Sequence, residues 1–144
     1  GNLDVADEMV NAADLVMASV HRFPGSDGTP IPFEEMDTND VVELEFQLSW
    51  AALSNPVIDI LGHPFGMSLR RFGVEPPEDK LRALMERSAT FGVMFEINSY
   101  YHPDPWRLIK MCREAGTDIS LGSNAHAAKD VGNIVRTLKG KAAL

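Results

Sequence analysis

Segments with helical periodicity alternate along the chain with short runs that are almost entirely apolar. The spacing of apolar residues predicts helices over residues 3–13, 38–53, 76–91, 104–115 and 127–138. The apolar runs predict strands over residues 14–21, 57–61, 93–98 and 118–121. This alternation is typical of an α/β fold in which right-handed crossovers join parallel strands that are covered on both faces.

One segment interrupts the alternation. Residues 23–37 contain three prolines and two glycines, and we predict that they form a loop. The loop is long, and long ordered loops in compact domains are often functional.

Polar side chains gather where the expected strands end. Since the carboxyl ends of parallel strands meet at one edge of a sheet, side chains at these positions are expected to converge. Three of the four histidines take part in this pattern. The residues at the strand ends are His21, His63, Glu96, Asn98, Asn124 and His126.

Each of these residues also has an ordinary structural interpretation. A single histidine at a strand end is more often a hydrogen-bonded turn residue than a ligand, and Asn98 alone is compatible with a turn in which its side chain bonds the backbone. Glu96 interrupts an apolar run, so it either pairs with a cation or points to solvent. His102 is expected to be a surface or loop-packing residue. The convergence favours a site, because neutral imidazoles together with carboxylates bind zinc, iron and manganese ions.

The same residues lie in four motifs that resemble the later motifs of the PHP superfamily, named after polymerase and histidinol phosphatase. The resemblance is greatest to the PHP domains of family X DNA polymerases and to histidinol-phosphatase-like phosphoesterases. It implies a distorted (β/α)7 barrel that holds two or three divalent metals, often zinc, manganese or iron, and hydrolyses phosphoesters. The motifs are Ala-Ser-Val-His (residues 18–21), Ile-Leu-Gly-His-Pro (60–64), Phe-Glu-Ile-Asn (95–98) and Leu-Gly-Ser-Asn-Ala-His (121–126).

By this resemblance, His21 and His63 are metal ligands, and Asn124 and His126 occupy the last ligand motif. The family most often has aspartate where this chain has Asn124, and an amide oxygen lacks the negative charge that favours hard cations. Metal loading is therefore expected to be weak or incomplete. Glu96 and Asn98 are candidates for supporting the ligands or binding substrate, and no catalytic residue is identified.

The early motifs of the family are absent from this sequence. A PHP domain begins with a His-x-His motif and continues to a Gly-x-Glu motif whose glutamate bridges metals. Neither motif occurs before His21 in this sequence. The chain is thus expected to form a single, partial PHP domain over residues 1–144, with about four strands of the C-terminal half. A half-barrel would leave an unpaired sheet edge, so we expect a homo-oligomer or association with a missing N-terminal half.

Composition restricts the remaining possibilities. The 144 residues suit one domain, and no apolar run approaches the ~18–20 residues needed to span a membrane. The single cysteine, Cys112, excludes an internal disulfide framework and suits the reducing cytoplasm. The net charge of -8 argues mildly against a nucleic-acid surface.

Two hypotheses follow. One is a metal-dependent phosphoesterase, active when the domain is complete, acting on a small phosphate monoester or on a nucleic acid 3′ end. The other is a catalytically impaired PHP remnant with a structural or regulatory role, for example within a DNA polymerase.

Overall fold

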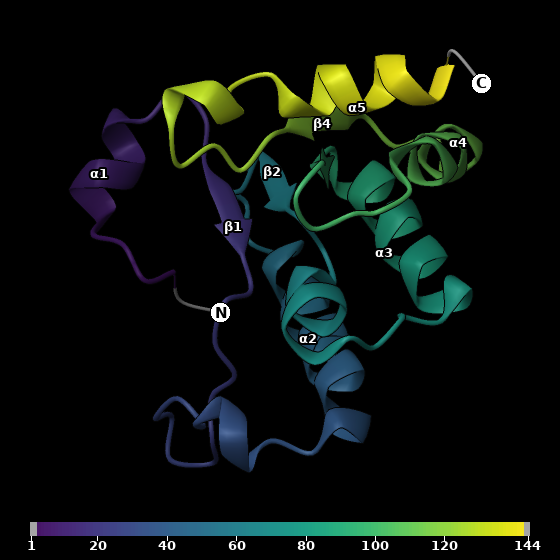
Figure 1. Ribbon diagram of the computed structural model, residues 1–144. Coiled ribbons are helices and arrows are strands. Elements are labelled where there is room, and N and C mark those ends of the chain that lie inside the picture. Colours follow the sequence, from purple (N-terminus) through teal and green to yellow (C-terminus); the bar gives the residue numbers. More distant parts are fainter. Residues whose placement is uncertain (1–2, 143–144) are drawn as a thin grey trace.

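The computed structural model describes residues 3–142 and shows an α/β fold built on one parallel sheet (Figure 1). The four strands lie in the order β1-β2-β3-β4, and each pairs in parallel with the next along the chain. The strands are β1 (Met17–Ser19), β2 (Ile60–Gly62), β3 (Met94–Asn98) and β4 (Ile119–Gly122). The α-helices are α1 (Asp7–Ala12), α2 (Thr38–Ala52), α3 (Glu78–Phe91), α4 (Pro105–Ala115) and α5 (Asn133–Ala142).

The sequential strand order shows how the sheet is wound. Helices α2, α3 and α4 join successive strands and pack side by side as one layer against the sheet (Figure 1). An open doubly wound sheet would reverse its strand order part-way, whereas a barrel adds each strand to the same side of the last. The arrangement is therefore consistent with part of an α/β barrel, as the sequence predicted.

Local sequence signals fix several helix ends. The side chain of Asp37 caps α2 by accepting a hydrogen bond from the Asn39 N–H, and Asp104 caps α4 in the same way from the Arg107 N–H. Helices α3 and α4 end at Gly92 and Gly116, both in the left-handed conformation that glycine adopts without strain.

The two ends of the chain differ from expectation. Strand β1 is much shorter than the predicted 14–21 and is not covered on both faces, since Leu15 is 59% exposed and Met17 is 47% exposed. The first helix covers only Asp7–Ala12 and buries no residue. The last helix begins at Asn133, after a 3-10 turn at Ala128–Asp130, and not at residue 127. For the first strand and the first helix, the apolar residues alone could not show whether other parts of the protein would pack on them.

The main core lies between the sheet and its helices. It includes Leu61 and Phe95 from the strands and Leu84 and Cys112 from the helices, all almost completely buried. A smaller cluster of Phe23, Val41 and Met67 anchors the long loop, whose residues Phe33–Glu35 form a 3-10 turn. The loop is therefore ordered by packing.

Within residues 3–142, no helix combines the length and the apolar character that crossing a bilayer demands.

Candidate functional site

His21 and His63 meet at the carboxyl edge of the sheet, as the convergence of strand ends predicted. His63 directly follows β2, and His21 lies two residues beyond β1. Parallel pairing aligns Ser19 with Gly62, so the segments after β1 and β2 leave the sheet at the same level. The two Nε2 atoms are 3.2 Å apart and the ring centroids 5.0 Å apart. His21 is exposed, whereas His63 is buried.

His63 is presented by a strained turn, residues 63–68, which we call the His63 turn. His63 has φ +29° and Phe65 has φ +61°, values that side-chain-bearing residues rarely adopt. Within the turn, the Gly66 N–H donates to the His63 carbonyl at 2.8 Å. Such strain persists only where the surroundings determine the conformation, and it is concentrated at functional sites.

Glu96 on β3 is one of the groups that hold this turn. Its Oε2 accepts a hydrogen bond from the His63 N–H at 2.7 Å, and its Oε1 accepts one from the Asn98 Nδ2 at 3.1 Å. The prediction that Glu96 pairs with a cation or points to solvent is wrong. The carboxylate is buried, and its burial is offset by these donors.

Asn98 has two roles at the end of β3. Its Nδ2 donates to Glu96, while its Oδ1 accepts the Tyr100 N–H at 2.9 Å and closes the turn that follows the strand. The side-chain turn considered for this residue is therefore present, and the bond to Glu96 is additional to it.

The segment after β4 carries Asn124 and His126. Asn124 has φ +47°, a left-handed conformation that asparagine tolerates better than most residues, and it is half-buried. His126 is exposed. Among residues 3–142, no three His, Cys, Asp or Glu side chains are close enough to hold a metal ion together. The structure therefore brings His21 and His63 together but does not add His126 to their group.

Two further residues beside His63 have no obvious signal in the sequence. Tyr101 stacks on the His63 ring at 4.2 Å between centroids. Of the two positions expected for His102, the loop-packing one is confirmed and the surface one is wrong: it is buried, its Nδ1 accepts the Asn98 N–H at 3.0 Å, and its Nε2 lies 3.0 Å from the Pro64 carbonyl. Because Nδ1 accepts, the ring carries its proton on Nε2 and donates it to Pro64. Contacts between residues 38 apart cannot be found from local patterns.

Burial keeps both inner histidines neutral. It lowers the pKa of His63 to about 4, with a further lowering from the nearby His21, and it lowers the pKa of His102 to about 4 as well. Both imidazoles are uncharged at pH 7.

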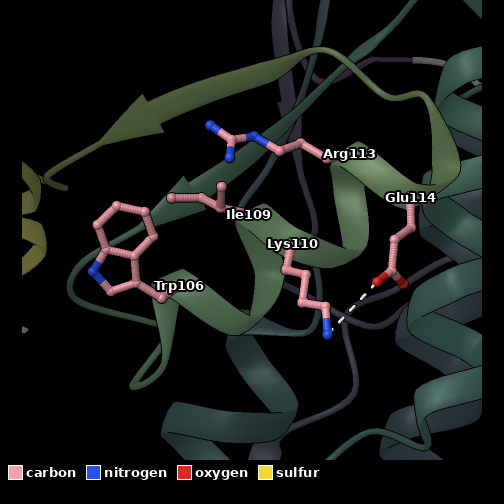
Figure 2. A pocket seen from close by; sticks show the side chains of 5 residues that line it. All are labelled: Trp106, Ile109, Lys110, Arg113 and Glu114. Carbon is pink, nitrogen blue, oxygen red and sulfur yellow. Dashed lines mark ion pairs between the residues drawn. The ribbon is translucent and has the colours of Figure 1, made fainter. Parts of the chain in front are cut away.

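Hollows of different size lie in the described part of the chain, and His102 lines one of about 60 Å³. A cavity of about 740 Å³ opens beside β1, and His21, Arg22 and Ser19 line it together with apolar side chains. Figure 2 shows a smaller one, about 280 Å³, on the outer side of α4, where Lys110 pairs with Glu114 at 3.8 Å. None of the candidate site residues lines the hollow on α4. The cavity beside β1 therefore adjoins the histidine pair through His21.

The histidine pair fits part of a metal site. Zinc–nitrogen bonds of about 2.0–2.1 Å in tetrahedral geometry place two ligand nitrogens about 3.3 Å apart, close to the observed 3.2 Å. The alternative is a hydrogen bond in which one Nε2–H donates to the other nitrogen. The buried Nδ1 of His63 has no hydrogen-bond partner among residues 3–142, so no bond from these residues fixes which nitrogen carries the proton.

Comparison with known proteins gives a consistent set of relatives. No protein-family model matches the chain. A protein from Syntrophotalea carbinolica is 30% identical over 146 residues, which are 96% of this chain and 53% of the relative. Proteins from Thermoanaerobacter pseudethanolicus and Clostridium novyi are 29% and 26% identical over 147 and 141 residues, covering 96% and 92% of this chain.

All three are named probable phosphatases. The similarity thus extends over nearly all of this chain and supports a phosphatase family. The chain spans about half the length of these curated relatives, 50–53% of each. What the longer proteins do as a whole is considered for this chain only as a proposal.

Proposed function

We propose that this chain is part of a PHP-type, metal-dependent phosphoesterase in which His21 and His63 bind one divalent metal. The observation that carries the proposal is the 3.2 Å separation of the two Nε2 atoms at the carboxyl edge of the sheet. The similarity to probable phosphatases supports the reaction class. Zinc, manganese and iron are the ions that suit imidazole ligands in hydrolytic sites.

The side chains around the pair would keep it ready for such an ion. Glu96 fixes the backbone of His63, and Tyr101 stacks on its ring, so the imidazole is held in one orientation before binding. The bound metal would polarise the phosphoryl group and lower the pKa of the water that attacks it. Asn124 and His126 would complete the set of ligands if the segment after β4 closed onto the pair.

The substrate class proposed is a small phosphorylated molecule. Arg70 is exposed near the site, with its guanidinium 4.3 Å from the centre of the Tyr100 ring, and Tyr100 contacts Tyr101 edge-on. A guanidinium in this position suits recognition of a phosphate. A nucleic acid 3′ end is the alternative substrate, although the net charge of -8 disfavours a long polyanion.

A second candidate function is a PHP remnant that no longer catalyses hydrolysis and serves as a structural or regulatory module. It is favoured by the finding that, in the described part of the chain, no third His, Cys, Asp or Glu joins the pair. Structural and catalytic metal sites normally need at least three protein ligands.

Under both proposed functions, we expect the protein to associate with a partner through β1. Within residues 3–142 no strand pairs with the outer edge of β1, Leu15 is exposed just before the strand, and the exposed Met17 lines the large cavity. A second copy, or the remainder of a longer protein, would cover this edge.

The two functions differ in their response to added metal. The chain would be titrated with Zn²⁺ and with Mn²⁺ by calorimetry, and the hydrolysis of an aryl phosphate would be followed in parallel. The phosphoesterase proposal expects binding with metal-dependent turnover, both lost in His21→Ala, a variant of an exposed residue. Binding without turnover would favour the remnant, and no binding by the wild type would refute the metal role of the pair.

A further inference from the structure

We propose that His102 is a positioning residue that fixes the His63 turn and thereby the direction of the His63 imidazole. It lies in the loop after β3, is 2% exposed, and makes no direct bond to His63. Its importance for metal binding rests on the function proposed above, but its effect on the turn does not.

The contact with Pro64 is the basis of this inference. Proline has no N–H, so the carbonyl is the only backbone hydrogen-bonding group of Pro64. The proton on His102 Nε2 satisfies that carbonyl at 3.0 Å from a loop 38 residues away. Pro64 stands between the two residues with positive φ, His63 and Phe65. The bond therefore acts at the centre of the strained segment.

Other parts of the protein bind the same turn on either side of Pro64. Glu96 from β3 accepts the His63 N–H. Glu45 from α2, 1% exposed, accepts the Met67 N–H at 3.1 Å and the Ser68 N–H at 2.7 Å. Three buried titratable side chains thus bind the backbone of one short turn. Burying charged carboxylates is costly, and a turn that merely reversed the chain would not need them.

Gly66, which has no side chain, gives a further indication that the turn positions the His63 ring and not only its backbone. A Cβ there would lie 2.9 Å from His63 Nδ1 and 2.9 Å from the Tyr101 Cδ1. The turn therefore leaves room for the stacked pair of rings, and the His63 side chain has few alternative positions.

The two nitrogens of His102 can be tested separately. In His102→Gln the amide nitrogen takes the place of Nε2 and can still donate to Pro64, whereas the bond to Asn98 is lost. In His102→Asn the amide oxygen takes the place of Nδ1 and keeps the bond to Asn98, but the Pro64 carbonyl loses its donor. Each variant loses one buried hydrogen bond, so the two are matched in structural damage.

The first measurement is native-state amide hydrogen exchange. The amides of His63 and Gly66 would be compared with that of Phe95, which is bonded within the sheet. The proposal expects exchange of the two turn amides to be about tenfold faster in His102→Asn, relative to Phe95, and within about threefold of wild type in His102→Gln. Equal changes in both variants, or no change in either, would overturn it. If His102→Asn does not fold, a loosened turn in His102→Gln alone would also overturn it.

The second measurement is the affinity for Zn²⁺ by calorimetry. Loss of a group that orients a ligand typically costs about 10- to 100-fold in metal affinity, so His102→Asn should bind Zn²⁺ at least about tenfold more weakly than His102→Gln. If the wild type binds Zn²⁺ and both variants bind it equally, His102 does not position the ligand. If the wild type binds no Zn²⁺, the proposed function fails, and the exchange rates alone decide the role of His102.

Discussion

The carboxylate of Glu96 occupies the space beside Gly122 where any other residue would place its Cβ. An added Cβ would collide with Glu96 Oε1 and would also lie 3.1 Å from Asn98 Nδ2. Gly122 pairs with Asn98 in the sheet, so the end of β4 lies directly beside the groups that hold the His63 turn. The glycine of the last motif is therefore explained by the buried carboxylate of the neighbouring strand.

Gly122→Ala should lower the unfolding free energy by about 1–3 kcal/mol, because the new methyl group displaces Glu96 from the His63 N–H. Gly140→Ala is the control, since Gly140 is inside α5 and, in the described part of the chain, no atom outside its own helix backbone and its chain neighbours lies within 4 Å of its added Cβ. That change should be neutral or stabilising by up to about 1 kcal/mol. Urea denaturation measures both, and equal effects would contradict the role given to Glu96.

The contribution of His126 to metal affinity tests whether it is a ligand, as the PHP resemblance implies, or stays apart from His21 and His63, as the structure shows. Because His126 is exposed and does not belong to a metal-holding group with His21 and His63, His126→Ala should change Zn²⁺ affinity less than about threefold, whereas His21→Ala should lower it at least about tenfold. Calorimetric titration measures both. Equal losses would show that the segment after β4 closes onto the pair when metal binds.

Stability should fall as the pH is lowered from about 6.5 to 5. In the unfolded chain His63 and His102 have ordinary pKa values of 6.5, but in the folded protein burial lowers the pKa of each to about 4. Above pH 6.5 neither state binds the proton, so the full stability is present. Below pH 6.5 only the unfolded state binds the proton. Each of the two histidines then lowers the free energy of unfolding by up to about 1.4 kcal/mol for each pH unit.

Denaturant midpoints at pH 7, 6 and 5 measure this slope above the range in which ordinary carboxylates titrate. His102→Gln removes one of the two groups and should flatten the slope. An unchanged slope in that variant would show that His102 does not stay neutral in the folded protein.

Arg87 should contribute to the contact between α2 and α3. Its guanidinium lies 4.1 Å from the centre of the Trp50 ring and 4.7 Å from that of Phe91, and its Nε donates to the Trp50 carbonyl. Arg87→Ala should lower the unfolding free energy by about 1–2 kcal/mol. Arg113→Ala, at the exposed hollow of Figure 2, should change it by less than about 0.5 kcal/mol. Thermal or urea unfolding would distinguish them, and equal losses would show that the stacking adds nothing.

The parts of the fold that depend on local signals could be predicted from the sequence. Strand β3 and helix α4 appear within one residue of expectation, because an apolar run and a helix between Asp104 and Gly116 are defined by neighbouring residues. The meeting of His21 and His63 was also predictable, since it follows from strand ends in a parallel sheet.

Features that depend on distant contacts could not be predicted. The π-helical segment Ser68–Phe72 begins where Glu45 accepts the Ser68 N–H from 23 residues away. The burial of His102 likewise depends on Pro64. The short β1 reflects a face that nothing covers within the described residues, and an apolar run does not tell whether its partner is present.

The order β1-β2-β3-β4 has a consequence for how the chain folds during synthesis. Each strand pairs with the strand made just before it, so no strand has to wait for a partner that has not yet been translated. The paired strands are nonetheless far apart along the chain, since Met17 pairs with Ile60 and Ile60 pairs with Met94, so each pairing closes a long loop that contains a helix. Within residues 3–142, the pairings can therefore form in the order in which the strands are synthesised, with the β3–β4 pairing following that of β2 and β3.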